Sequence, residues 1–403
     1  MAYTADSGRS QLIAGPLLST LSSADNSGVA FVTPEKSETS TKPRRKLPNI
    51  TNSGPLLDRW GRTATDLRIS LTDKCNLRCI YCMPADGLQW LPKENLLSAE
   101  EIARLADIAI SQLGVEEIRF TGGEPLVRAD LVDIISRIHQ EHPEVPLAIT
   151  TNGIGLDKRA AALAEAGLTR INVSLDTICR ETFAELTRRD KLEAVLKGID
   201  GAAEAGLWPI KINAVLMPGL NDGQAPELLE WALKGGYQLR FIEQMPLDAD
   251  NRWTREGTIT AAEIREKLSA AYVLGSVREA RGDSPARLWE VYPLGTVLDE
   301  AGFPVDGAES LGRVGIIASV TESFCGACTR TRLTADGKIR SCLFSDTETD
   351  LMQLLRSGAT DDELALRWRE GMWFKPRAHG KEDADFDIEE FAKASRSMSA
   401  IGG

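Results

Sequence analysis

The segment Cys75-Asn76-Leu77-Arg78-Cys79-Ile80-Tyr81-Cys82 decides how the chain is interpreted. Its cysteines follow the short apolar run 67–71, which predicts a β-strand, so we expect them in a loop at that strand's end. Three thiolates this close together can ligate three irons of a four-iron cluster and leave the fourth iron open to an exchangeable ligand. A structural zinc knot is the alternative, but closed zinc sites take four protein ligands, and no histidine or fourth cysteine lies nearby.

The chain around this segment alternates between strand and helix patterns. Apolar or β-branched runs predict strands at 67–71, 118–121, 147–151, 171–175, 210–216 and 239–244. Stretches of helical period lie between them, at 99–113, 159–166 and 193–205. This alternation predicts an α/β fold with a parallel sheet. Six such units predict a partial, open barrel of TIM type, with the site in the loops at the carboxyl ends of the strands.

We expect three parts along the chain. Residues 1–47 are rich in Ser, Thr, Gly and Pro and predict a disordered extension. A transit peptide is the alternative, but Arg9 is the single arginine of the first forty residues. Residues 48–270 form the predicted barrel. Residues 271–403 form an appended C-terminal region, in which 271–320 predicts strands and loops and 349–355 and 361–372 predict helices.

Composition narrows the function classes. The net charge of -12 argues against broad binding to nucleic acid or to an anionic membrane, so an anionic substrate needs a local cluster of cations. No stretch reaches the roughly 18 apolar residues of a membrane span. Seven cysteines, grouped as two triples plus Cys179, do not resemble a disulfide framework and predict a reducing, cytoplasmic compartment. Cys179 itself is expected to be a small buried apolar residue.

A glycine pair follows the second predicted strand, in Thr121-Gly122-Gly123-Glu124-Pro125. Two glycines let the backbone approach a ligand without a Cβ clash, although ordinary turns also use them. The position one βα unit after the cysteine loop favours a ligand-binding role.

A second cysteine triple, Cys325, Cys328 and Cys342, again offers three thiolates without a fourth. A zinc ribbon would need one more ligand, and the nearest downstream histidine is His379. The ligand count therefore favours a second four-iron cluster, whose open iron suits a bound substrate.

Arg330 and Arg332 lie between these cysteines. Alternate residues of an extended segment share one face, and arginine forks match phosphate oxygens. The pair suits a phosphorylated substrate, with a solvated strand face as the alternative.

Over residues 55–403 the chain resembles the GTP 3',8-cyclase family, the molybdenum cofactor biosynthesis proteins A of the radical S-adenosylmethionine superfamily. The resemblance is carried by Cys75–Cys82, Thr121–Pro125, Ser174–Thr177, Arg240–Pro246, the second triple with Arg330 and Arg332, and the Gly402-Gly403 end. It implies a lyase that converts GTP to (8S)-3',8-cyclo-7,8-dihydroguanosine 5'-triphosphate, the first step of molybdenum cofactor (molybdopterin) biosynthesis. The implied cofactors are two [4Fe-4S] clusters and S-adenosyl-L-methionine.

The resemblance also implies a chemistry for each cofactor. The first cluster would cleave S-adenosylmethionine to a 5'-deoxyadenosyl radical. That radical would take hydrogen from C3' of the GTP ribose, and the resulting carbon radical would attack C8 of guanine. The second cluster would hold the guanine edge.

Residue roles follow from the same resemblance. The implied cluster ligands are Cys75, Cys79, Cys82, Cys325, Cys328 and Cys342. The S-adenosylmethionine pocket would include Tyr81, Gly123, Ser174 and Met245. The GTP contacts would be Arg68, Arg119, Thr150, Lys211, Arg330 and Arg332. Catalytic roles are implied for Arg330, Arg332, Gly402 and Gly403. Each strand residue could instead be structural, but Lys211 in an apolar strand would then bury an ammonium group at high cost.

The expected partners are GTP, the downstream enzyme cyclic pyranopterin monophosphate synthase, an unidentified electron donor and a second copy of the chain in a homodimer, with no nucleic acid and no membrane. Two other readings stay open. A peptide-modifying radical maturase shares the first triple but usually carries more than three cysteines in its C-terminal part. An iron–sulfur sensor or zinc-binding regulator leaves Thr121–Pro125 and Lys211 without a role.

Overall fold

The computed structural model describes residues 53–248, 250, 252–379 and 396–402. The predicted extension 1–47 lies outside these residues. No helix in the described part of the chain is long and apolar enough to cross a membrane.

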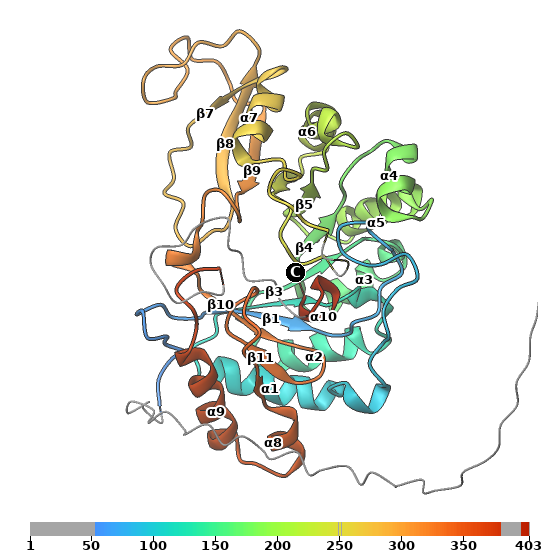
Figure 1. Ribbon diagram of the computed structural model, residues 1–403, viewed down its shortest axis with the longest axis vertical. Helices are drawn as coiled ribbons and strands as arrows, with labels where there is room; N and C mark the ends of the chain where they lie inside the picture. Colours follow the sequence, from blue (N-terminus) through green and yellow to red (C-terminus); the bar gives the residue numbers. More distant parts are fainter. Residues whose placement is uncertain (1–52, 249, 251, 380–395, 403) are drawn as a thin grey trace, which may run out of the picture. The chain divides into compact units, whose positions relative to one another are not determined.

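Six parallel strands form the centre of the sheet, each beside the next in chain order (Figure 1). They are β1 (Asp66–Ser70), β2 (Glu117–Thr121), β3 (Leu147–Thr151), β4 (Leu168–Ser174), β5 (Ile210–Val215) and β6 (Gln238–Ile242). The apolar runs of the sequence predict all six of these strands, and the α/β class is confirmed. Because the strands are parallel, their carboxyl ends and the loops that follow them gather at one edge of the sheet.

The sheet is larger and more mixed than the six predicted strands. Its order is β12-β11-β10-β1-β2-β3-β4-β5-β6-β9-β8-β7, in which β10 runs parallel to β1 and β9 runs parallel to β6. The added strands are β7 (Tyr272–Gly275), β8 (Arg287–Pro293), β9 (Gly312–Ile317), β10 (Arg330–Leu333), β11 (Lys338–Arg340) and β12 (Thr349–Asp350). The C-terminal part of the chain therefore extends the sheet at both of its ends.

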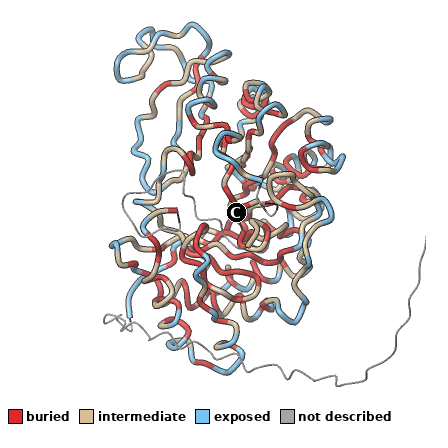
Figure 2. The backbone as a smooth tube through the Cα atoms, in the orientation of Figure 1, coloured by how far each residue is buried: buried red, intermediate tan, exposed pale blue. Residues whose placement is uncertain are grey.

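Helices cover the side of the central strands that carries the apolar residues (Figure 1). They are α1 (Ala99–Ser111), α2 (Leu131–Glu141), α3 (Ala160–Glu165), α4 (Arg180–Thr187), α5 (Leu192–Glu204), α6 (Ala225–Lys234) and α7 (Ala261–Ser269). The helix α1 begins where Ser98 accepts from the Glu101 amide while the Glu101 carboxylate accepts from the Ser98 amide. Figure 2 shows that the buried residues follow the strands and the sides of the helices that face them.

Three helices follow the sheet: α8 (Met352–Arg356), α9 (Asp361–Trp373) and α10 (Met398–Ile401). The helix predicted from Thr349 is wrong at its start, because Thr349 and Asp350 pair with β11 and the helix begins at Met352. Local periodicity could not reveal this pairing, which depends on a strand ten residues away. The helix predicted at 361–372 is confirmed.

Candidate active site

The central strands carry polar side chains on the face opposite the helices. In β1, Leu67 and Ile69 are fully buried in the core, whereas Asp66, Arg68 and Ser70 alternate with them on the other face. Parallel strands covered on both faces are normally apolar on both. A polar face in the middle of this sheet therefore indicates a binding site.

Seven cations lie on this polar face, and we call them the cation band: Arg68, Arg119, Arg170, Lys211, Arg240, Arg330 and Arg332. They come from strands that lie side by side in the sheet. Arg68 is in register with Arg119 on one neighbouring strand and with Arg332 on the other. Arg240 is in register with Asn213, to which it donates a hydrogen bond of 2.9 Å.

The cation band carries more positive charge than its own strands neutralise. Asp66 pairs with Arg68 at 2.9 Å, and Glu117 pairs with Arg119 at 3.2 Å and with Arg170 at 2.6 Å. Among the described residues, Lys211 makes no hydrogen bond or ion pair.

The titration of Lys211 reflects this excess of cations. Burial and the charges of Arg240, Arg170 and Arg119 lower the pKa of Lys211 to about 8. The Nε atoms of Arg119 and Arg170 are buried without a hydrogen-bond partner among the described residues. Donors left unpartnered beside several other cations are suited to an anionic ligand.

The first cysteine triple lines a pocket at the carboxyl ends of β1 to β4. The pocket contains Cys75, Cys79, Cys82, Tyr81, Gly123, Thr150 and Ser174. The structure thus brings the first triple together with three of the four residues expected in the S-adenosylmethionine pocket and with one expected GTP contact.

The glycine pair is explained by its contact with the cysteine loop. A Cβ on Gly122 would lie 2.4 Å from the carbonyl oxygen of Thr72, and a Cβ on Gly123 would lie 2.3 Å from that of Lys74. The Gly123 amide donates to Thr72 at 2.7 Å, and the Glu124 amide donates to Lys74 at 2.7 Å. The motif therefore holds the chain immediately before Cys75 in place.

Two buried carboxylates brace the same pocket. Glu124 accepts hydrogen bonds from the Thr151 hydroxyl at 2.6 Å and from the Asn152 amide at 2.6 Å, which ties the end of β2 to the end of β3. Burial raises the pKa of Glu124 to about 7 despite these bonds. Asp176 accepts from the Tyr81 hydroxyl at 2.7 Å and from the Val215 amide at 2.8 Å, so it joins the cysteine loop to β5.

The thiols of the first triple are protonated at neutral pH when no metal is bound. Burial and the charge of Cys75 raise the pKa of Cys82 to about 12, and burial also raises the pKa values of Cys75 and Cys79. Metal loading must therefore release protons. Within the described part of the chain, no three His, Cys, Asp or Glu side chains are gathered closely enough to hold one metal ion.

The second triple lines a separate pocket with Arg330, Arg332, Met245 and Phe324. The structure places Met245 here rather than beside the first triple. The Arg330 guanidinium lies 4.9 Å from the Phe324 ring centre and donates to the Cys328 sulfur at 3.4 Å. Burial opposes ionisation of Cys328, but the charges of Arg330 and Lys375 lower its pKa to about 6. This thiol is therefore ionised at neutral pH and ready to ligate a metal.

The C-terminal residues reach the cation band. Arg332 donates to the Gly402 carbonyl at 2.5 Å, and the Ser70 hydroxyl donates to the Ile401 carbonyl at 2.8 Å. Gly402 has a φ of 82°, and a Cβ there would lie 2.4 Å from the Ser70 hydroxyl oxygen. The expected position of Gly402 near the site agrees with this arrangement, whereas Gly403 lies outside the described residues.

Comparisons with known proteins show the family to which the chain belongs. A model of the radical SAM superfamily matches residues 69–232, and a model of the family Molybdenum Cofactor Synthesis C matches residues 237–381. A GTP 3',8-cyclase of Paenarthrobacter nicotinovorans is 59% identical over 86% of this chain and 97% of its own length. A GTP 3',8-cyclase of Streptomyces coelicolor is 54% identical over 86% of this chain and 96% of its own length. The chain belongs to the GTP 3',8-cyclase family.

Membership in the GTP 3',8-cyclase family implies the cofactors of radical SAM enzymes, a [4Fe-4S] cluster and S-adenosylmethionine. The first triple fits them, because its three thiols line one pocket together with Tyr81, Gly123 and Ser174.

Four residues of this site received no individual role from the sequence. Arg170 and Arg240 belong to the cation band, and Glu124 and Asp176 brace the first pocket. Arg240, Glu124 and Asp176 lie within motifs that carry the family resemblance, whereas Arg170 directly precedes the predicted strand 171–175 and lies within β4. The expected burial of Cys179 is wrong: this cysteine is partly exposed, and its thiol lies 3.3 Å from the Glu181 carboxylate.

Proposed function

We propose that this chain binds GTP on its cation band and converts it to (8S)-3',8-cyclo-7,8-dihydroguanosine 5'-triphosphate, the first step of molybdenum cofactor biosynthesis. The observation that carries the proposal is the excess of buried cations between the two cysteine pockets, in a chain whose overall charge is -12. A triphosphate is the ligand class that such a cluster suits.

In this proposal Cys75, Cys79 and Cys82 hold one [4Fe-4S] cluster. When bound, the cluster supplies the electron that cleaves S-adenosylmethionine to a 5'-deoxyadenosyl radical. Gly123 lets the end of β2 pack against the chain just before Cys75, and Tyr81, Gly123 and Ser174 border the pocket in which S-adenosylmethionine would bind. Asp176 fixes the Tyr81 side chain, and Glu124 fixes the ends of β2 and β3 around the pocket.

Cys325, Cys328 and Cys342 would hold a second [4Fe-4S] cluster in the pocket that contains Met245. The ionised Cys328 and the adjoining arginines support this assignment. Arg332 borders this second pocket and is in register with Arg68 of β1, whose carboxyl end leads to the first pocket. A guanine edge bound in the second pocket would therefore direct the ribose toward the first pocket.

The cation band would hold and orient the triphosphate. Lys211 and the Nε atoms of Arg119 and Arg170 have no partner within the part of the chain that the structure describes, so they are suited to phosphate oxygens. Thr150 lines the first pocket and would contact the ribose side of GTP. Catalytic roles are proposed for Arg330, Arg332, Gly402 and Gly403, as the family resemblance implies. Fixing C3' of the ribose beside the first pocket is the main contribution that the protein can make to radical chemistry.

We further propose that the parallel strands form an open barrel, with residues 48–270 as the radical SAM part and 271–403 as the C-terminal part. None of the seven cysteines forms a disulfide, which supports a reducing cytoplasmic location. The product would pass to cyclic pyranopterin monophosphate synthase, and an electron donor would supply the first cluster. A homodimer stays a prediction.

The test is an anaerobic assay of the reconstituted protein with dithionite, S-adenosylmethionine and either GTP or ATP. We expect formation of 5'-deoxyadenosine together with a cyclised product from GTP and not from ATP. Replacing Lys211 with Met should weaken GTP binding by about tenfold or more, the effect of one lost charge-assisted hydrogen bond. The matched control replaces Lys197 with Met. Lys197 is exposed on α5, outside the cation band, so this change should leave GTP binding unaltered. Deoxyadenosine formed without consumption of GTP would overturn the substrate assignment.

A further inference from the structure

The C-terminal segment 396–402 contacts residues of both cysteine pockets. Met398 and Ser399 line the first pocket, whereas Ile401 packs against Leu247 and Phe344 next to the second. The carbonyl of Gly402 then takes a hydrogen bond from Arg332 of the cation band. The segment therefore forms a wall shared by both parts of the site.

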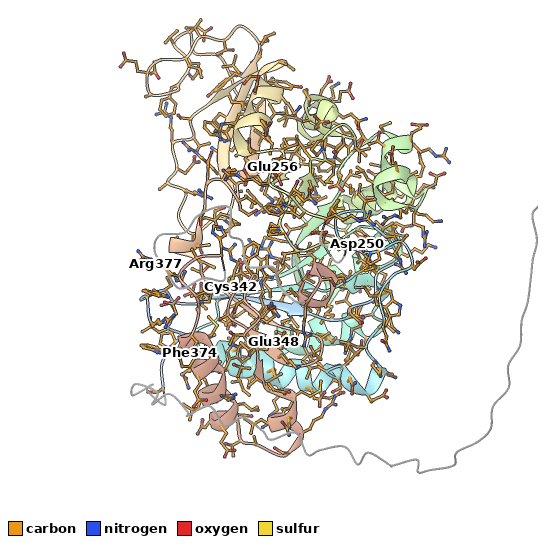
Figure 3. All side chains as sticks on the ribbon, in the orientation of Figure 1. Asp250, Glu256, Cys342, Glu348, Phe374 and Arg377 are labelled. Carbon is orange, nitrogen blue, oxygen red and sulfur yellow. The ribbon has the colours of Figure 1, made fainter. Side chains whose placement is uncertain are left out.

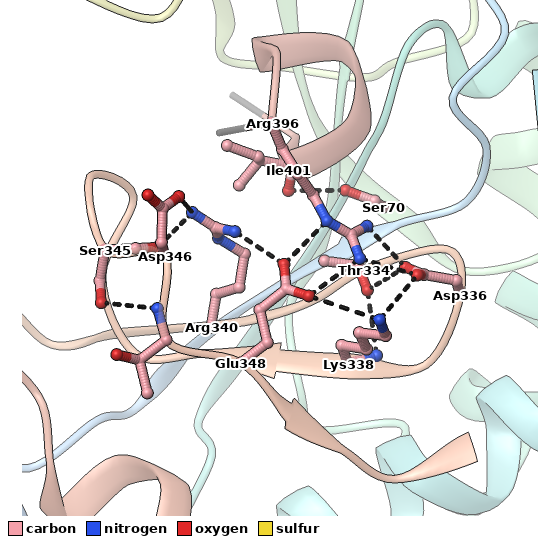
Figure 4. A network of polar contacts seen from close by, with 11 residues as sticks. Ser70, Thr334, Asp336, Lys338, Arg340, Ser345, Asp346, Glu348, Arg396 and Ile401 are labelled. Carbon is pink, nitrogen blue, oxygen red and sulfur yellow. Dashed lines mark hydrogen bonds and ion pairs between the residues drawn. The ribbon is translucent and has the colours of Figure 1, made fainter. Parts of the chain in front are cut away.

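A group of ion pairs holds the beginning of this segment (Figure 4). The Arg396 guanidinium binds both carboxylate oxygens of Asp336 at 2.9 Å and both of Glu348 at 2.8 and 2.9 Å. The three side chains are only 13–21% exposed. Ion pairs that are fully forked and partly shielded from water are stronger than isolated surface pairs.

The same group reaches the second cysteine pocket. Glu348 also pairs with Arg340 at 2.7 Å, and Arg340 is completely buried at the end of β11. Cys342, the third cysteine of the second triple, follows two residues later (Cys342 and Glu348 are labelled in Figure 3). Glu348 is thus bound at once by the C-terminal segment and by the strand that leads to Cys342.

We propose that Arg396 is a positioning residue that holds the Gly402 carbonyl on Arg332 and so fixes the wall that the two pockets share. This inference rests on the proposed function for its consequence, because a fixed wall keeps a radical formed in the first pocket directed at GTP. The physical reason is entropic. A free chain end frays unless something ties it down, and only five residues separate Arg396 from Gly402. An anchor at Arg396 therefore restricts where Gly402 can lie.

Once Arg396 is held by its ion pairs, the residues from 397 to 402 have little conformational freedom. The short helix α10 fills the interval, and the Met398 amide donates to the Leu247 carbonyl at 3.3 Å. Gly402 itself fits between Ser70 and Thr121 only because it lacks a Cβ. Without the anchor, these few contacts alone would have to order the segment.

The test compares Arg396→Gln and Arg396→Lys with the unchanged protein. A matched control is Arg356→Gln, because Arg356 forms a similar forked pair with Glu101 between α8 and α1, outside the segment 396–402. Hydrogen exchange is measured on the peptide that contains residues 397–402. The reconstituted enzymes are then assayed for the ratio of cyclised GTP to 5'-deoxyadenosine.

We expect faster exchange in the Arg396→Gln segment and a ratio lower by about tenfold or more, while S-adenosylmethionine cleavage continues. Arg396→Lys should partly restore the slow hydrogen exchange and the product ratio. An ammonium group keeps the charge but cannot form the two-pronged hydrogen bonds that a guanidinium makes with two carboxylates. The control should match the unchanged protein. Unaltered exchange and an unaltered ratio in Arg396→Gln would overturn the positioning role. If the unchanged protein makes no cyclised GTP, the proposed function fails, and the exchange measurement still decides whether Arg396 anchors the segment.

Discussion

Replacing Gly123 with Ala tests whether the glycine pair holds the first cysteine loop. The new Cβ would lie 2.3 Å from the Lys74 carbonyl oxygen and 2.5 Å from that of Asp73, whereas ordinary contact begins at 3.4 Å. Both obstacles are backbone atoms, so the loop must move by about 1 Å. Metal–ligand distances tolerate only about 0.2 Å, so the shift, which directly precedes Cys75, should disrupt cluster binding.

We expect Gly123→Ala to lose about half of its roughly eight irons after anaerobic reconstitution and to lose S-adenosylmethionine cleavage. Overpacking should also lower the free energy of unfolding of the metal-free protein by about 1–3 kcal/mol, measured in urea. Gly223→Ala is the control, because no atom lies within 4 Å of its added Cβ. Full iron content and normal cleavage in Gly123→Ala would refute the explanation of the glycine pair.

Three further predictions concern the pH dependence, a brace and the second pocket. GTP binding should weaken as the pH rises through about 8, because Lys211 loses its proton there, and equilibrium dialysis across this range checks it. Lys211→Arg should flatten the dependence, since arginine keeps its charge; an unchanged slope would contradict this role. Tyr81→Phe removes a 2.7 Å hydrogen bond to buried Asp176. It should lower the free energy of unfolding, measured in urea, by about 1–3 kcal/mol, and Tyr237→Phe is the control. A loss no larger than the control's would argue against the brace. Arg62→Gln removes hydrogen bonds to the carbonyls of Cys325, Pro376 and Arg377 and should lower iron at the second triple while S-adenosylmethionine cleavage persists. Iron analysis showing no loss would count against this support.

The sequence was informative wherever the signal was local. Apolar runs predicted β1 to β6 because each strand packs one face against helices, and the tight spacing of Cys75, Cys79 and Cys82 indicated their chemistry. The strand at Thr349 was missed because two residues become a strand only by pairing with β11.

The rest of the site depends on strands coming together in three dimensions. Arg170 and Arg240 join the cation band only through the register of neighbouring strands, which one sequence does not specify. Glu124 lies in the glycine-pair motif, but its role depends on hydrogen bonds to Thr151 and Asn152 at the end of β3. Arg396 is an isolated arginine in the sequence, and its partners Asp336 and Glu348 lie 60 and 48 residues away.

The most direct test of the proposed function follows one hydrogen atom. The reconstituted protein is incubated anaerobically with dithionite, S-adenosylmethionine and GTP that carries deuterium at C3' of the ribose, and the 5'-deoxyadenosine is analysed by mass spectrometry. If the cation band holds the ribose beside the first pocket, one deuterium appears in the 5'-deoxyadenosine and cyclised product accumulates. Deoxyadenosine without deuterium, formed while GTP stays intact, would contradict the account.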